Sequence, residues 1–297
     1  MDKTAIMNGA SPSSLRPHPS SLPEWDPDFL SRSPMFDPLR AHAGAFGTVW
    51  PGLADLQRLL DARDPPVLNV AGMPLRLVPQ GRRNRALEEK HEARTFLAGE
   101  LQVREGSWHD LFNLLAWLAF PRSKAALNAC HYAALVAQRA AGAVNRGPAQ
   151  DALTLFDEGG VVVASDDDGL LALLREWRWK ELFWSERRRL AARMCFHAFG
   201  HALHEKALRP FHGITARGIV LKTAPELLAA PLPEQIVGLD ARVAAYLADP
   251  GSLLATRELA VVPVLGVPGW CADNGREAYY DDRDHFRPGR LREKRES

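Results

Sequence analysis

Residues 107–128 read SWHDLFNLLAWLAFPRSKAALN and decide the fold of this chain. Ser107 and Asp110 match the S-x-x-[DE] capping pattern that opens a helix, and Pro121 ends that helix. Apolar side chains cover nearly the whole circumference of the helix, which is typical of a buried helix. Ser123 caps a second helix, which we expect over residues 124–141. The sequence therefore predicts a core built around two consecutive helices.

Outside this pair, helical and β-branched segments are mixed. The patterns predict helices over residues 53–60, 168–177, 185–208 and 232–247, and short strands or hairpins over residues 67–78, 152–164, 214–221 and 261–267. The expected hairpin 152–164 turns at Asp157–Gly160. Strands and helices do not alternate regularly, so we expect an α+β fold that is mainly helical with short β-hairpins.

Composition divides the chain into three parts. Of its 297 residues, 46% are hydrophobic and 25% are charged, which is the composition of a globular protein. Residues 1–22 are rich in Ser and Pro and poor in apolar side chains, so we expect a disordered tail. Residues 23–290 are expected to form a single globular domain. Residues 291–297 are basic and polar, and we expect them to fray.

The charge balance and the cysteines limit the partners and the compartment. Lys and Arg number 37 against 36 Asp and Glu, a net charge of +1, so the molecule as a whole has no field that attracts a polyanion. No segment approaches the ~18 consecutive apolar residues of a membrane helix. The three cysteines are widely spaced without a C-x-x-C pair, which favours a reducing compartment. We expect a soluble cytoplasmic protein that acts on a small-molecule substrate, with no membrane partner and an unknown oligomeric state.

Polar side chains on the two central helices form the first candidate site. The chain has no P-loop, no G-x-G-x-x-G, no G-x-S-x-G and no H-E-x-x-H motif, so the common catalytic patterns are excluded. Helical spacing places the candidates in two stripes, His109, Asp110 and Asn113 on the first helix and Lys124, Asn128 and His131 on the second. Such a cluster suits acid–base chemistry, but it equally suits a structural hydrogen-bond network in which Asp110 only caps its helix.

Two further groups carry carboxylates or histidines. Asp157 and Glu158 stand at the expected hairpin tip, where turn chemistry explains them as well as a paired acid and base does. On the expected helix 185–208, His201 and Glu205 could bind a divalent metal together with His197, four residues before His201. Histidines at this spacing are more often core or surface residues, so the sequence favours a structural role for them.

The chain resembles a bacterial family defined as domain of unknown function number three thousand and twenty-five, over about residues 88–290. The shared motifs are EGSWHDLFN at 105–113, FPRSKAALN at 120–128, RGP at 146–148, LTLFDEGG at 153–160, WKELFW at 179–184, FGHAL at 199–203 and PVLGVPGW at 263–270. The resemblance places His201 within the family pattern and His197 and His204 outside it, which argues against a site made of three histidines. The resemblance identifies related proteins, but it implies no particular reaction.

Three functions remain open from the sequence. The leading hypothesis is a hydrolase or phosphate-ester-processing enzyme that uses the two stripes with Asp157, Glu158 or His201 nearby. The alternative is a binding or scaffold protein whose polar cluster is a structural network. A nucleic-acid binder comes third, because Trp177–Lys180 interleaves aromatic and basic side chains.

The two asparagines distinguish a pocket from a closed core. If the stripes face a pocket, Asn113→Leu and Asn128→Leu should each change the free energy of unfolding by less than about 1 kcal/mol, since pocket residues are not selected for stability. A loss above about 2 kcal/mol in both variants would identify a structural network. Denaturant melts with an unchanged slope give the comparison.

Overall fold

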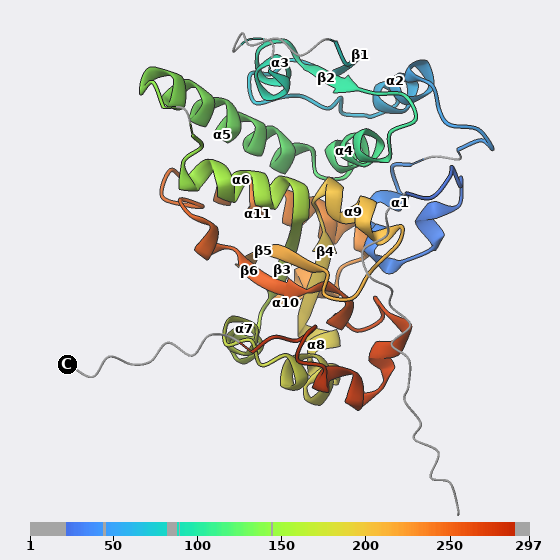
Figure 1. The fold of residues 1–297 in the computed structure, drawn as a ribbon, viewed down its shortest axis with the longest axis vertical. Helices are drawn as coiled ribbons and strands as arrows, with labels where there is room; N and C mark the ends of the chain where they lie inside the picture. The colour runs from blue at the N-terminus through green and yellow to red at the C-terminus, as the bar shows by residue number, and fades with distance from the viewer. Residues whose placement is uncertain (1–21, 44–45, 82–87, 89, 144, 289–297) are drawn as a thin grey trace, which may run out of the picture.

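The computed structural model describes residues 22–43, 46–81, 88, 90–143 and 145–288 (Figure 1). The helices are α1 (Asp37–Arg40), α2 (Leu53–Asp61), α3 (His91–Ala98), α4 (Trp108–Ala119), α5 (Pro121–Ala140), α6 (Pro148–Gly159), α7 (Asp168–Arg175), α8 (Arg187–Arg193), α9 (His201–Ala207), α10 (Pro225–Ala229) and α11 (Leu232–Ala248). The strands are β1 (Arg76–Pro79), β2 (Glu100–Val103), β3 (Gly160–Ser165), β4 (Met194–Ala198), β5 (Thr215–Lys222) and β6 (Ala260–Pro263). The expected α+β fold with mainly helical content is confirmed. The expected tails, residues 1–22 and 291–297, lie outside the described residues except for Leu22.

Two small sheets frame the helices. The larger sheet has the strand order β4-β3-β5-β6, in which β3 and β5 are parallel and the two outer pairs are antiparallel. Every residue of β3 is buried, as expected for a central strand. The smaller sheet pairs β1 with β2 in parallel. Figure 1 shows α4, α5 and α6 between the two sheets, so the predicted central helix pair lies in the middle of the molecule.

The expected helix 185–208 is wrong. Residues 187–193 are helical as α8, but the chain then extends as β4 and turns helical again only at His201. The extended segment pairs with β3, with Val162 opposite His197. Helical spacing placed His197 and His201 on one face, but sheet pairing moves His197 onto a different element. Backbone pairing to a distant strand is information that a local periodicity does not contain.

The expected hairpin 152–164 is also wrong. Residues 152–159 belong to α6, so Asp157 and Glu158 lie in the last turn of a helix and not at a hairpin tip. Only the second half of the segment is a strand, and it pairs with β4 and β5. In the expected hairpin 67–78, Leu68 and Pro74 form an isolated bridge, while residues 76–79 pair with β2.

A close backbone approach brings the end of α6 to the start of α9. The backbone N–H groups of Phe199 and Gly200 both donate to the Gly160 carbonyl at 3.0 Å. A Cβ at Gly200 would lie 2.3 Å from the Gly160 nitrogen and 2.4 Å from the Glu158 carbonyl oxygen. Only glycine allows this contact. The FGH and DEGG motifs therefore meet in space, which places His201 beside Asp157 and Glu158.

A buried carboxylate fixes the start of α5 to α11. Asp240 of α11 is 3% exposed and accepts from the backbone N–H groups of Arg122 at 3.0 Å and Ser123 at 2.7 Å. These are first-turn donors of α5 that have no partner within the helix. The Ser123 hydroxyl donates to the backbone carbonyl of Asp240 at 2.9 Å. The carboxylate therefore supplies a cap from a residue 117 positions away.

Removing this cap should destabilise the protein. We expect Asp240→Ala to lower the free energy of unfolding by about 2 kcal/mol, because two buried N–H groups lose their acceptor. Asp240→Asn keeps one carbonyl oxygen and should lose less than the alanine variant. Urea melts of the three proteins measure the order. Equal stability of the alanine variant and the parent would contradict the capping role.

Candidate functional site

The candidate site lies where α4, α5, α6 and α9 converge. The candidate residues identified from the sequence are far apart along the chain, and the fold brings seven of them together. From α4 come His109 and Asn113, from α5 Lys124, from the last turn of α6 Asp157 and Glu158, and from α9 His201 and Glu205. The stripes of α4 and α5 do meet, and they meet at Lys124.

Lys124 is a buried ammonium with two partners. Its side chain is 4% exposed, and Nζ donates to Asn113 Oδ1 at 2.9 Å and to Asp157 Oδ1 at 2.5 Å. Burial alone would raise the pKa of Asp157, but the Lys124 ammonium lowers it well below the usual range. The carboxylate is therefore ionised at neutral pH. The Lys124 ammonium therefore links α5 to α4 and to α6.

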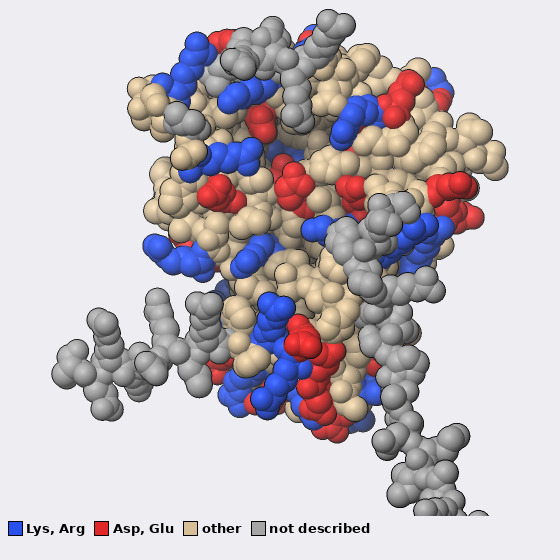
Figure 2. All heavy atoms as spheres, viewed as in Figure 1, with Lys and Arg blue, Asp and Glu red and all other residues tan. Residues whose placement is uncertain are grey.

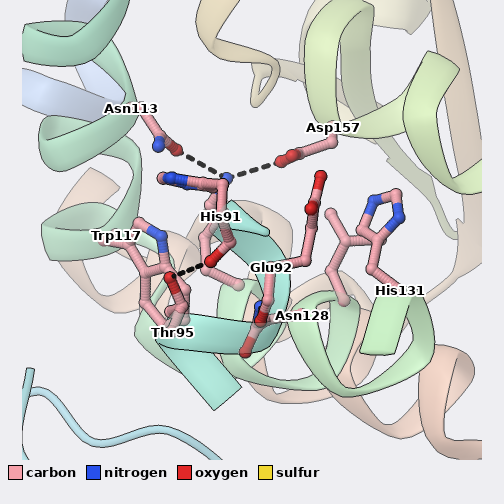
Figure 3. A pocket seen from close by; sticks show the side chains of 10 residues that line it. His91, Glu92, Thr95, Asn113, Trp117, Asn128, His131 and Asp157 are labelled. Atoms are coloured by element: carbon pink, nitrogen blue, oxygen red, sulfur yellow. Dashed lines mark hydrogen bonds and ion pairs between the residues drawn. The ribbon is translucent and has the colours of Figure 1, made fainter. Parts of the chain in front are cut away.

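A small cavity lies on one side of this ion pair. Its volume is ≈ 40 Å³, which is room for a few water molecules. Figure 3 shows Asn113 and Asp157 directed at Lys124, with Glu92 and His131 on the same side as Asp157. The cavity is lined by His91, Glu92, Thr95, Asn113, Trp117, Lys124, Leu127, Asn128, His131 and Asp157.

One buried acceptor of this cavity has no hydrogen-bond partner among the described residues. Asn128 donates through Nδ2 to the Glu92 carbonyl at 2.9 Å, while its buried Oδ1 has no partner among the described residues. Burial lowers the pKa of both His91 and His131, which keeps their imidazoles neutral at pH 7. Asn113 holds the ammonium and Asn128 does not, so Asn128→Leu is the cleaner of the two asparagine variants.

On the other side of Asp157, two histidines face each other. The Nε2 atoms of His109 and His201 are 3.1 Å apart. Nδ1 of His109 is 3.0 Å from Glu205 Oε2, and that hydrogen bond raises the pKa of His109. Nδ1 of His201 lies 3.8 Å from Asp157 Oδ1. Burial lowers the pKa of His201 to about 3. Each imidazole therefore turns its Nδ1 toward a carboxylate and its Nε2 toward the other ring.

Two neutral imidazoles leave one buried atom of this arrangement without a partner. His109 donates from Nδ1 to Glu205, which leaves a lone pair on its Nε2. His201 can donate from Nε2 to that lone pair at 3.1 Å, and its own buried Nδ1 then has no hydrogen-bond partner, with Asp157 Oδ1 3.8 Å away. If His201 instead carries its proton on Nδ1, two lone pairs face each other across 3.1 Å. A cation shared by the two Nε2 atoms, either an added proton or a metal ion, lets Nδ1 of His201 keep its proton toward Asp157.

Glu158 completes a group of three metal-type ligands. Its Oε2 lies 3.6 Å from His201 Nε2, and one ligand atom from each of His109, Glu158 and His201 lies within 4.8 Å of the others. Burial raises the pKa of Glu158, although its side chain is 45% exposed. Glu205 is the partner of His109 and lies outside this group. On the face drawn in Figure 2, acidic side chains are exposed where the ends of α6 and α9 lie in Figure 1.

Three sequence candidates lie apart from this group. Asp110 accepts from the backbone N–H of Arg104 at 2.8 Å and from its guanidinium, and its own N–H donates to the capping hydroxyl of Ser107, so it belongs to the start of α4. Asn128 and His131 line the small cavity, and neither belongs to the group formed by His109, Glu158 and His201.

The sequence missed five residues of the cavity, His91, Glu92, Thr95, Trp117 and Leu127. His91 and Glu92 fall in the mixed-charge segment 82–94, whose composition is typical of a solvated surface. Trp117 lies on the apolar circumference of its helix, and the centre of its ring is 5.8 Å from Lys124 Nζ. The one available signal was the His-Glu pair at the start of an otherwise amphipathic helix.

Comparison with known proteins gives one match. The family profile described as Protein of unknown function (DUF3025) matches residues 75–290, which confirms the resemblance found in the motifs. No curated protein and no solved structure matches the chain. Among the described residues, no helix has the length and apolarity needed to cross a membrane.

The buried ion pair can be tested against a surface pair on the same helix. Lys124→Met should lower the free energy of unfolding by about 3 kcal/mol, because Asp157 then keeps a mostly buried charge without its cation. Arg139→Met removes an exposed cation of α5 that pairs with Glu88 at 3.6 Å, and we expect it to stay within about 0.5 kcal/mol of the parent. Guanidinium melts compare the three proteins. Similar losses in both variants would contradict the central role of Lys124.

Proposed function

The chain belongs to the DUF3025 family of proteins of unknown function, and from its own geometry we propose that it is a metal-dependent hydrolase. The metal is held by His109, His201 and Glu158. This proposal keeps the hydrolase suggested by the sequence and replaces Glu205 with Glu158 as the carboxylate ligand.

The opposed histidines are the observation that carries the proposal. Two imidazole Nε2 atoms 3.1 Å apart are placed to bind one cation together, and a carboxylate oxygen lies 3.6 Å from one of them. Two histidines and one carboxylate are the donor set of many catalytic zinc sites, which leave a fourth position for water. Glu205 is hydrogen-bonded to Nδ1 of His109 at 3.0 Å, and the Asp157 carboxylate lies 3.8 Å from Nδ1 of His201. Carboxylates that bond to the second nitrogen of a metal-bound histidine orient its ring and increase its basicity.

The exposure of two of the three ligand side chains is compatible with hydrolysis. His109 is 33% exposed and Glu158 is 45% exposed, so water and substrate can reach the ligands from one side. A metal held by His109, Glu158 and His201 would lower the pKa of a bound water to about 7, which would supply a hydroxide nucleophile at neutral pH, and it would polarise a carbonyl or phosphoryl oxygen of the substrate.

Lys124 and the cavity support the same chemistry. The ammonium balances Asp157, which lies between the cavity and His201, so the carboxylates around the metal ligands are partly neutralised. The cavity beside them offers the unpartnered Oδ1 of Asn128 to a hydrogen-bond donor of the substrate. In the scaffold alternative, a hydrogen bond instead of a metal joins the histidine pair.

Metal binding separates the two alternatives. We expect the full-length protein, stripped with a chelator and titrated with Zn²⁺ by calorimetry, to bind one ion per chain. Saturation at about a hundredfold excess over Kd should raise the melting temperature by about 5 °C or more. Glu158→Gln changes a half-exposed side chain and should weaken binding by at least about tenfold. His212→Ala removes a histidine outside the site and should leave the stoichiometry unchanged.

Activity is measured on the same proteins. The Zn²⁺ form should hydrolyse a p-nitrophenyl phosphate or a p-nitrophenyl carboxylic ester faster than free Zn²⁺ does, and Glu158→Gln should lose that activity. Failure to bind any divalent metal would favour the structural network. Tight binding of Fe²⁺ with oxygen consumption would keep the metal site and reject the hydrolase, because the same three ligands serve iron oxygenases.

A further inference from the structure

A second groove lies where the end of α7 meets β5 and β6. Its volume is ≈ 650 Å³, within the range of sites for small organic ligands. The polar and aromatic side chains that line it are Arg175, Trp177, Arg217, Tyr246, Arg257 and Glu258. None of them belongs to the histidine site or to the cavity beside it. Figure 2 shows basic side chains on the flank where β5 and β6 lie in Figure 1.

The three arginines of this groove are unpaired. Within the described part of the chain, the guanidinium groups of Arg175, Arg217 and Arg257 have neither an ion pair nor a hydrogen bond. Nearby arginines are different: Arg178 pairs with Glu181 and Glu176, and Arg189 pairs with Asp167. The only carboxylate that lines the groove is that of Glu258, and it accepts from the Ala255 N–H at 3.0 Å. The groove therefore carries an excess of positive charge.

Trp177 sits in the groove in a conformation that favours glycine. It follows α7 with a φ of 60°, and the Arg178 N–H donates to the Leu173 carbonyl at 3.0 Å, which closes a Schellman turn. The left-handed position of that turn is usually a glycine, because a Cβ is disfavoured there. Strained residues of this kind cluster at ligand sites. The turn displays a half-buried indole at the groove beside Arg175.

We propose that this groove binds a nucleoside phosphate, a small anion that carries a planar ring. Guanidinium groups bind phosphate oxygens in bidentate pairs, and three unpaired ones can neutralise a diphosphate. Trp177 and Tyr246 supply aromatic faces for the base. Glu258 supplies an acceptor for an N–H or hydroxyl donor of the base or the sugar. This site is independent of the metal centre and of the proposed hydrolase activity.

Single-stranded nucleic acid is the alternative occupant, and the structure disfavours it. The two basic side chains of the segment Trp177–Lys180, which suggested a nucleic-acid binder, are paired outside the groove: Arg178 with Glu181, and Lys180 with Asp281 and Glu277. On the face drawn in Figure 2, acidic and basic side chains are interleaved over the lower part of the molecule. The unpaired positive charge belongs to a compact hollow and not to an extended track.

The experiment uses a fluorescent N-methylanthraniloyl analogue of ADP with the full-length protein. We expect saturable binding of one analogue per chain by fluorescence anisotropy, with displacement by ADP. Arg175→Gln and Arg257→Gln should each weaken binding by about tenfold, because each removes a charge-assisted pair. Arg178→Gln is the matched control, since this neighbouring arginine is exposed and pairs with acids outside the groove, and its affinity should equal that of the parent.

Trp177→Gly separates ligand contact from a structural role. Glycine suits the turn, so the thermal midpoint should stay within a few degrees of the parent while the affinity falls by about tenfold. No binding at about 1 mM analogue would overturn the proposal. Equal displacement by inorganic phosphate and by ADP would overturn the recognition of a ring. Binding of oligo-uridylate without binding of the mononucleotide analogue would reassign the groove to nucleic acid.

Discussion

The buried ammonium of Lys124 is the constraint on which the site depends. A charge that is 4% exposed is stable only with partners close by, and the chain supplies Asn113 from α4 and Asp157 from α6. These contacts fix the position of Asp157, whose other neighbour is His201. The ion pair therefore does more than stabilise the helices. It sets the place of the carboxylate behind one of the two opposed histidines.

A close backbone contact between Gly160 and Gly200 brings the remaining residues of the site together. Gly160 and Gly200 allow the ends of α6 and β4 to approach to contact distance, and β3 and β4 pair directly after that point. As a result Glu158 and His201 are neighbours although they lie on different elements. The third residue of the proposed metal site, His109, comes from the buried helix α4 and is oriented by Glu205 of α9. Four elements thus converge, and a neutral pair of imidazoles leaves the buried Nδ1 of His201 without a hydrogen-bond partner.

The larger sheet connects the two proposed sites. Gly160 of β3 stands opposite Arg217 of β5, so the strand that follows the metal ligands is paired with the strand that lines the arginine groove. The two sites differ in charge: carboxylates surround the histidines, and unpaired guanidinium groups line the groove. A net charge of +1 conceals this separation, because opposite local charges cancel in the sum.

The sequence by itself determined the mainly helical α+β class, the buried helix α4 with its Ser107 cap, and the two polar stripes to which Asn113 and Lys124 belong. Capping, proline and helical periodicity are local properties, which is why the sequence records them. It also selected every residue of the histidine site as a candidate, without assigning them to one group. Only the tertiary structure decided that residues 194–198 form a strand, that Asp157 ends a helix and that Glu158, not Glu205, joins the histidines. The reason is physical: strand pairing and a glycine contact between segments about forty residues apart depend on partners that no local pattern records.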